Sequence, residues 1–291
     1  MIRSMLFVPG NSPGMLLSAD IFDADALILD LEDAVAPDQK DAARILVRNA
    51  LDTKYYQNCT LVIRVNPINT PYTQDDLKVI VPRGPYAILA PKVDTPEMAR
   101  EFAAMMTRIE TEHGMETGAV KLIPLLETAL GIENAYAIAS ADRRISAVLL
   151  GAEDLTSDLR AMRSKPGLEI AYSRGRIVAA ARAAGIDVYD TPFTDVFDDN
   201  GLVADARLAR ELGFTGKAAI SPRHVRPINE VFSPSKQEIE YAEEVLAVIE
   251  DAAAAGRGAV SLRGKMIDKP IVDRARYVLE TARKLGGKRH E

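Results

Sequence analysis

Two carboxylates near the middle of the chain stand at positions that suit the binding of a hard metal ion. Glu127 follows the apolar run 121–126, and Asp154 follows the run 147–150. Apolar runs of this length, bounded by polar or glycine-containing turns, are typical of parallel strands buried on both faces. A helical pattern over 131–141 separates them, so we expect a strand–helix–strand unit whose two carboxylates emerge at one sheet edge. The alternative is that each carboxylate only faces the N-terminal dipole of a following helix.

The composition restricts the metal that such a pair would bind. The chain has three histidines and one cysteine, and it contains neither an HxH nor an HExxH spacing, so a zinc site is not expected. Oxygen ligands favour Mg2+, with Mn2+ as the alternative. Two carboxylates leave coordination positions for water and for a substrate that offers a carboxylate beside a hydroxyl or keto oxygen.

Eight short apolar runs alternate with helical stretches over the first three quarters of the chain. This alternation predicts a parallel sheet, and eight such units favour its closure into a (β/α)8 TIM barrel. A doubly wound open sheet is less favoured, because no GxGxxG follows the first run. The expected strands are 5–8, 26–31, 61–65, 86–90, 121–126, 147–150, 186–189 and 218–220.

The pattern changes after residue 222. A long amphipathic helix is expected over 236–255, a glycine-punctuated stretch covers 256–270, and a final helix is expected over 271–285. We therefore expect a catalytic barrel over 1–222. The remaining residues, 223–291, would form a helical extension that serves as a lid on its own subunit or reaches a neighbour.

Polar and charged residues follow nearly every expected strand, and this is the face on which barrel enzymes place their active sites. The pattern predicts a metal-assisted site for an anionic substrate. The residues concerned are Pro9, Glu32, Asp33, Asn66, Lys92, Glu127, Glu153, Asp154 and Asp190.

Arg64 lies inside the apolar stretch LVIRVNP, where an arginine needs an anionic partner. It either pairs with Glu32 or Asp33 on the adjacent strand or points at a substrate oxygen that gains negative charge, such as that of an enolate. Both can hold together. A Schiff-base lysine at Lys92 or Lys217 is a less favoured alternative, because no spacing supports it.

The charge pattern argues against several classes of partner. The net charge is -6, from 36 basic and 42 acidic residues that are well interspersed, and aromatic residues make up 5% of the chain with no Trp. A nucleic-acid partner is therefore not expected. No apolar run approaches about 18 residues, and Pro9 and Gly10 interrupt the N-terminal stretch, so we expect a cytoplasmic protein without a membrane partner.

Six motifs, in order along nearly the whole chain, resemble the citrate lyase β-subunit family. Members of this group are Mg2+-dependent C–C lyases with a (β/α)8 barrel, and stand-alone malyl-CoA and citramalyl-CoA lyases belong to it. The motifs are RSMLFVPGN, DALILDLEDAV, VIRVNPINTPY, PLLETALGI, GAEDLTSDLR and GKMIDKPIVDRAR.

The resemblance implies a role for each matching residue. Glu127 and Asp154 fall on the metal ligands, and Arg64 on the arginine that steadies a thioester enolate. Asp268 falls on an acid/base aspartate that some relatives lend to a neighbouring subunit. The other implied site residues are Glu32 and Asp33 as supporting carboxylates, Gly131 and Ile132 as the turn that receives the substrate carboxylate, and Pro9 and Lys92 as further substrate contacts. One departure is Ala219-Ile220-Ser221-Pro222, where many relatives have a histidine before the proline.

The resemblance also implies an activity and partners. The expected reaction is cleavage of a citryl thioester on an acyl carrier protein to oxaloacetate and an acetyl thioester. The expected partners are the α and γ subunits of citrate lyase and further copies of this chain in a trimer or hexamer. A stand-alone lyase of malyl-CoA or citramalyl-CoA is the first alternative, and a non-catalytic assembly subunit is the second.

Overall fold

The computed structural model describes residues 1–53, 56, 58–254 and 260–287. It divides into two compact units, one formed by Ile2–Asn229 and the other by Met1 with Glu230–Glu291. The expected boundary at residue 222 coincides with the first residue of helix α10 (Pro222–Phe232), whose last turn belongs to the second unit. That the second unit acts as a lid stays a prediction.

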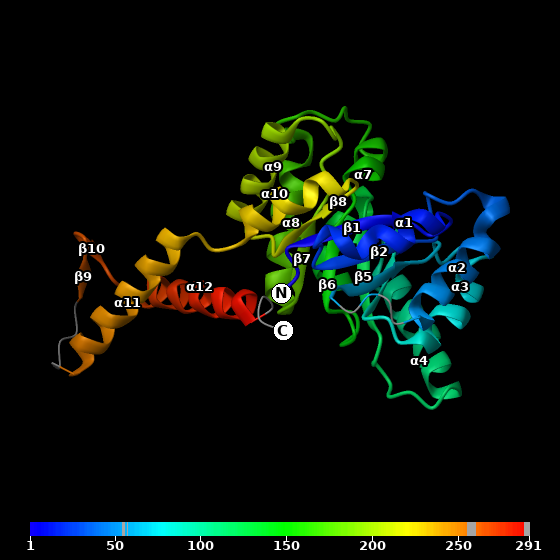
Figure 1. Ribbon diagram of the computed structural model, residues 1–291, viewed down its shortest axis with the longest axis horizontal. Helices are drawn as coiled ribbons and strands as arrows, with labels where there is room; N and C mark the ends of the chain where they lie inside the picture. Colours follow the sequence, from blue (N-terminus) through cyan, green and yellow to red (C-terminus); the bar gives the residue numbers. More distant parts are fainter. Residues whose placement is uncertain (54–55, 57, 255–259, 288–291) are drawn as a thin grey trace. The chain divides into compact units, whose positions relative to one another are not determined.

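In the described part of the first unit, eight parallel strands close into a barrel in sequence order (Figure 1). Closure is made by β1 and β8, where Ser4 pairs with Lys217. The strands are β1 (Ser4–Pro9), β2 (Ala26–Asp30), β3 (Thr60–Arg64), β4 (Ala87–Ala90), β5 (Lys121–Leu126), β6 (Ala147–Leu150), β7 (Asp187–Asp190) and β8 (Gly216–Ala219). The predicted (β/α)8 barrel is confirmed.

Alternate strand residues fill the barrel interior, as the two-residue period of a strand requires. The interior set includes Met5, Ala26, Ile28, Val62, Ala87, Leu89, Ile123, Leu125, Ala147, Leu149, Tyr189 and Ala218. The same period continues past the apolar layers. Asp30 comes two residues after Ile28, and Arg64 two after Val62. The strands thereby carry charged side chains to the carboxyl-terminal end of the interior.

Helices connect the strands around the barrel. The longer ones are α2 (Lys40–Asp52), α3 (Thr73–Ile80), α4 (Pro96–Glu112), α8 (Ala171–Ala184) and α9 (Asp199–Leu212). The single helix expected over 131–141 is instead two short ones, α5 (Ala129–Glu133) and α6 (Ala135–Ala139), which meet at Asn134. A further short helix, α7 (Ala152–Asp158), follows β6. The sequence pattern did not indicate this helix, because its first turn carries two acidic residues.

The second unit is built on two helices, α11 (Lys236–Ala254) and α12 (Lys269–Gly287). They share an apolar core that includes Val245, Ile267 and Val272. A small antiparallel hairpin, β9 (Ser261–Leu262) with β10 (Lys265–Met266), occupies part of the expected glycine-punctuated stretch, of which 256–259 lies outside the described residues. Among the described helices, none is both long and apolar enough to cross a bilayer.

Candidate active site

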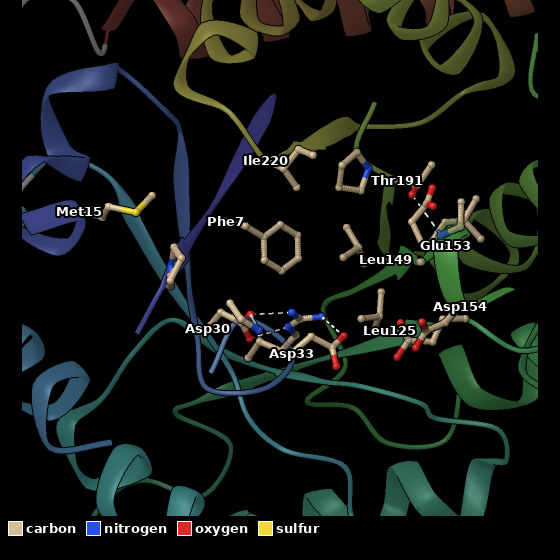
Figure 2. Close-up of a pocket in the computed structure, with 18 residues that line it drawn as sticks. Phe7, Met15, Asp30, Asp33, Leu125, Leu149, Glu153, Asp154, Thr191 and Ile220 are labelled. Atoms are coloured by element: carbon tan, nitrogen blue, oxygen red, sulfur yellow. Dashed lines mark hydrogen bonds and ion pairs between the residues drawn. The ribbon is translucent and has the colours of Figure 1, made fainter. Parts of the chain in front are cut away.

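A cavity of about 470 Å3 lies at the carboxyl-terminal ends of the barrel strands. Its charged lining comprises Asp30, Asp33, Arg64, Glu127, Glu153 and Asp154, and its apolar lining includes Phe7, Pro9, Met15, Leu125, Leu149, Pro192 and Ile220. Figure 2 shows the carboxylates of Asp33 and Asp154 on one side of the cavity and the side chain of Ile220 on the other. The cavity therefore offers a charged wall and an apolar wall to a small substrate.

Glu127 and Asp154 reach this cavity from neighbouring strands. Strands β5 and β6 pair in parallel, with Leu125 opposite Leu149, so their carboxyl ends meet at one edge. Glu127 is buried directly after β5, and Asp154 is half-buried in the first turn of α7 after β6. The strand–helix–strand arrangement expected from the sequence is confirmed.

Gly151, between β6 and α7, makes room for the Glu127 side chain. A Cβ atom at residue 151 would lie 2.7 Å from both Cβ and Oε2 of Glu127. Real side chains do not approach each other this closely, so the Glu127 carboxylate lies where it does only because residue 151 is glycine.

Lys92 connects several carboxylates of the site. Its backbone N–H donates a hydrogen bond to Oε1 of Glu127 at 2.8 Å, and its Nζ lies 3.0 Å from Oε1 of Glu32 and 3.3 Å from Oδ2 of Asp154. The backbone of Lys92 has φ +52°, a left-handed conformation that is uncommon outside glycine. Residues held in this region cluster at functional sites, because the surrounding structure must compensate the strain.

Arg64 is held in a fixed orientation by two carboxylates. Its Nε and Nη2 donate hydrogen bonds to the two oxygens of Asp30 at 2.7 and 2.6 Å, and its Nη1 lies 2.9 Å from Oε2 of Glu32. Burial acts to lower the pKa of Arg64, but Asp30 and Glu32 outweigh it and raise the pKa above its ordinary value. The guanidinium therefore stays charged.

The partner of Arg64 corrects the sequence expectation in part. We expected Glu32 or Asp33, but the bidentate partner is Asp30, and Asp33 is farther away at 3.5 Å. Asp30 pairs in register with Arg64 across β2 and β3. The usable signal was the two-residue period from Ile28, which turns Asp30 toward the barrel interior.

The site carries more negative than positive charge. Five carboxylates, those of Asp30, Glu32, Asp33, Glu127 and Asp154, surround the two cations Arg64 and Lys92. Burial, followed by the charges of Glu32 and Asp154, raises the pKa of Glu127 to about 8. Burial also raises the pKa of Glu32, although Arg64 opposes it.

This excess of carboxylate oxygen fits a hard divalent cation, which would relieve the repulsion that contributes to the raised pKa of Glu127. Within the described residues, no three His, Cys, Asp or Glu side chains converge as a ready metal cage. Glu127 and Asp154 would therefore hold a metal as a pair, and the remaining coordination positions would go to water and substrate.

The chain matches the HpcH/HpaI aldolase/citrate lyase family over residues 3–222. It belongs to this family. The citrate lyase subunit beta of Leuconostoc mesenteroides subsp. cremoris is 42% identical, in a match that covers 96% of this chain and 93% of that protein. The human mitochondrial citramalyl-CoA lyase is 31% identical, over 96% of this chain and 85% of that protein.

A solved structure of similar architecture belongs to CitE from Mycobacterium tuberculosis, in complex with magnesium, acetoacetate and coenzyme A. It is 30% identical to this chain, with a TM-score of 0.79, and the match covers 96% of this chain and 97% of that one. The family resemblance inferred from the six motifs is thus confirmed.

Of the residues expected to act in this HpcH/HpaI family member, Pro9, Arg64, Asp33, Glu127 and Asp154 all line the cavity. Lys92 and Glu32 lie beside it through their contacts with Asp154 and Arg64. Their catalytic and binding roles stay predictions.

Gly131 and Ile132 do not line the cavity either. The backbone N–H of Gly131 donates to Oγ1 of Thr128 at 3.0 Å, and that of Ile132 donates to the carbonyl oxygen of Thr128 at 3.0 Å, so both are engaged within the first turn of α5. Asp268 lies in the second unit, where its Oδ1 accepts a hydrogen bond from the N–H of Ile271 at 3.2 Å at the start of α12.

Sequence reasoning did not single out Phe7 or Thr191, which also line the cavity. The ring centroid of Phe7 lies 5.0 Å from the Arg64 guanidinium carbon, a cation–π arrangement. Thr191 directly follows β7. This position after a strand end was the feature of the sequence that could have indicated a place in the site.

Proposed function

We propose that this family member is the β subunit of a citrate lyase, which cleaves a citryl thioester to oxaloacetate and an acetyl thioester. The observation that carries the proposal is the convergence of Glu127, Asp154 and Arg64 on one cavity. Carboxylate oxygens and a guanidinium are what a lyase needs to bind a hydroxy acid and stabilise an enolate. The 42% identical relative is a citrate lyase subunit beta.

Glu127 and Asp154 would hold Mg2+, with Mn2+ as the alternative. When bound, the metal supplies a Lewis acid that lowers the pKa of the citryl hydroxyl group. Gly151 leaves space for Glu127, and the N–H of Lys92 fixes its Oε1. The solved relative contains magnesium together with acetoacetate and coenzyme A.

Arg64 stabilises the charge that develops when the carbon–carbon bond breaks. One of the site carboxylates takes up the hydroxyl proton, the carbinol carbon becomes the keto carbon of oxaloacetate, and the electrons of the broken carbon–carbon bond move into the enolate of the acetyl thioester. Because Asp30 and Glu32 already hold the guanidinium, no reorganisation is needed at that moment. The apolar wall formed by Phe7, Leu149 and Ile220 limits access of water to the enolate carbon.

The enolate carbon must finally receive a proton. We assign this step to Asp268, supplied by the same chain or by a neighbouring copy in a trimer or hexamer. Glu32 and Asp33 support the site by orienting Arg64 and Lys92. In this proposal the thioester is carried on an acyl carrier protein, the α and γ subunits of citrate lyase are the partners, and the protein acts in the cytoplasm.

The purified chain should be offered (3S)-citryl-CoA, malyl-CoA and citramalyl-CoA in parallel, each with Mg2+ and each with a chelator. Oxaloacetate from the citryl thioester alone, abolished by the chelator, is the expected result. Glyoxylate from malyl-CoA, or pyruvate from citramalyl-CoA, would move the assignment to a stand-alone CoA lyase. No product from any thioester would favour a non-catalytic assembly subunit.

The stand-alone lyase is the second candidate because of the apolar wall. Leu149 and Ile220 of this wall line the cavity, and such a surface suits the methyl group of a citramalyl thioester better than the second free carboxylate of a citryl thioester. The human relative at 31% identity is a citramalyl-CoA lyase. The ratio of oxaloacetate to pyruvate in the same assay decides between the two.

A further inference from the structure

We propose that Thr191 is a positioning residue that fixes the first turn of α7 and thereby places Asp154 relative to Glu127. The inference rests on the proposed function, because it concerns the same pair of metal ligands. It assigns a task to a side chain whose hydroxyl oxygen contacts the backbone of α7.

Helix α7 begins without a side-chain cap of its own. Its N-cap residue is Gly151, which has no side chain to accept a hydrogen bond from the first turn. Ser, Thr, Asp or Asn is the usual N-cap residue, because its side-chain oxygen satisfies one of the exposed backbone N–H groups. None of these fits at residue 151, since a Cβ atom there would lie 2.7 Å from Glu127. The space that Glu127 needs therefore leaves the helix uncapped.

Thr191 supplies the missing acceptor from the next strand. Its Oγ1 accepts a hydrogen bond from the backbone N–H of Ala152, the first residue of α7, at 3.1 Å. The side chain is 1% exposed, and the contact is drawn as a dashed line beside the Thr191 label in Figure 2. Asp154 lies in the same helical turn as Ala152, so a shift of that turn would move its carboxylate.

Thr191 is itself held in place by buried charges. Its carbonyl oxygen accepts a hydrogen bond from Nζ of Lys217 at 2.6 Å. Lys217 also lies 2.5 Å from Asp190 and 2.6 Å from Asp205, and it is fully buried. The hydroxyl that anchors α7 is thus attached to a rigid part of the barrel, so the first turn of the helix is fixed before any ligand binds.

Thr215 offers a matched control for a purely structural role. It is also a buried threonine, and its Oγ1 accepts a hydrogen bond from the backbone N–H of Val188 at 3.3 Å. Val188 lies in β7, and Thr215 directly precedes β8, at the amino-terminal ends of the strands and away from the cavity. Loss of either hydroxyl should reduce stability, but only loss of the Thr191 hydroxyl should change metal binding.

The test is calorimetric titration of Mg2+ into the chelator-treated full chain, with the melting temperature measured on the same samples. Groups that orient metal ligands typically contribute about 10- to 100-fold in metal affinity, so Thr191→Val should raise the Kd for Mg2+ by about 10-fold. Thr191→Ser, which keeps the hydroxyl, should retain the wild-type Kd. Thr191→Cys, whose sulfur is a weak acceptor, should fall between them, and it carries the test if the valine variant does not fold.

The Thr215→Val control should lower the melting temperature and leave the Kd unchanged. An unchanged Kd in the folded Val or Cys variant of Thr191 would overturn the inference, and so would an equal rise in the Thr215 control. If the wild-type chain itself binds no Mg2+, the proposed metal site fails first, and that outcome is distinct from a failure of the Thr191 assignment.

Discussion

Two groups of charged residues in the barrel differ in how their charges balance. The outer cluster, Arg174, Asp190, Asp205 and Lys217, lies between β7, β8 and the helices α8 and α9. It has two cations and two carboxylates, and every member is at most 9% exposed. The site cluster, Asp30, Glu32, Asp33, Arg64, Lys92, Glu127 and Asp154, has two cations and five carboxylates.

The difference separates a structural network from a binding site. Buried charges that are fully paired need no further partner, whereas surplus carboxylates must take up either a proton or a cation from outside. The directions of the pKa shifts in the two clusters agree with this difference in charge balance. Burial acts to raise the pKa of Asp205, but Lys217 and Arg174 outweigh it and lower the pKa. In the site cluster, burial and neighbouring carboxylates raise the pKa of Glu127 to about 8.

Removal of one metal-binding carboxylate should give the largest effect. Asp154→Asn should lower Mg2+-dependent cleavage by about 10^3-fold, because a metal contributes several kcal/mol to the stabilisation of the transition state. The melting temperature of the metal-free protein should change little, since the Asp154 side chain is 43% exposed. Turnover at saturating Mg2+ and the melting temperature are the measurements.

Asp199→Asn is the matched control for this variant. Asp199 is also in the first turn of a barrel helix, α9, but it pairs with Arg223 and does not line the cavity. It should keep wild-type turnover. Equal losses in the two variants would mean that the charge pattern of the site cluster carries no information about metal binding.

Disruption of the outer cluster should cost stability of the folded barrel. Arg174→Met leaves Asp190 and Asp205 with Lys217 as their remaining cation. Removing one partner from a buried ion network costs about 3–5 kcal/mol, which urea unfolding would measure. The control is Arg100→Met, because Arg100 and its partner Glu97 are exposed on α4, and such pairs contribute about 1 kcal/mol or less. Equal losses in both variants would contradict the structural role of the outer cluster.

The raised pKa of Glu127 predicts how the metal-free protein responds to pH. The ordinary value of 4.5 applies to the unfolded chain, and the folded value is about 8. Between these two values the folded state binds the extra proton, so stability should fall as the pH rises through this window and level off above it. Glu127→Gln, which cannot ionise, should lack this fall when melting temperatures are compared in chelator across the window. Parallel curves for the two proteins would contradict the raised pKa.

The barrel was predictable because most of its strands contain a short apolar run. Each expected strand end lies within two residues of the observed one. The positions of the candidate metal pair were predictable for the same reason, since Glu127 directly follows such a run and Asp154 comes four residues after the end of another. The two-residue period from Ile28 could turn Asp30 toward the barrel interior, but its place opposite Arg64 depends on the register between β2 and β3, which the sequence does not give.

The remaining features depend on contacts between distant segments. The outer cluster joins side chains from two strands and two helices, and no local pattern predicts those pairings. The left-handed backbone of Lys92 and the hydrogen bond from Ala152 to Thr191 are likewise set by the packed barrel. Such features become visible only after the strands are placed side by side.

The two clusters also differ in how they should tolerate an added methyl group. Gly151→Ala, beside Glu127 of the site cluster, would force the Glu127 side chain to move, because the new Cβ would lie 2.7 Å from it. Overpacking of this kind costs about 1–3 kcal/mol, and displacement of Glu127 should also raise the Kd for Mg2+. Urea unfolding and calorimetric titration would check both effects. A variant with wild-type stability and affinity would show that Glu127 has room elsewhere.

Gly175→Ala should have the smallest effect and the opposite sign. Gly175 lies inside α8 next to Arg174 of the outer cluster, and a Cβ atom there would meet nothing within 4 Å. Because alanine restricts the unfolded chain and favours a helix, the variant should gain about 0.5–1 kcal/mol in urea unfolding. Its Kd for Mg2+ should not change. A loss of stability would contradict the open space around residue 175. It would mean that α8 beside Arg174 does not tolerate an added methyl group.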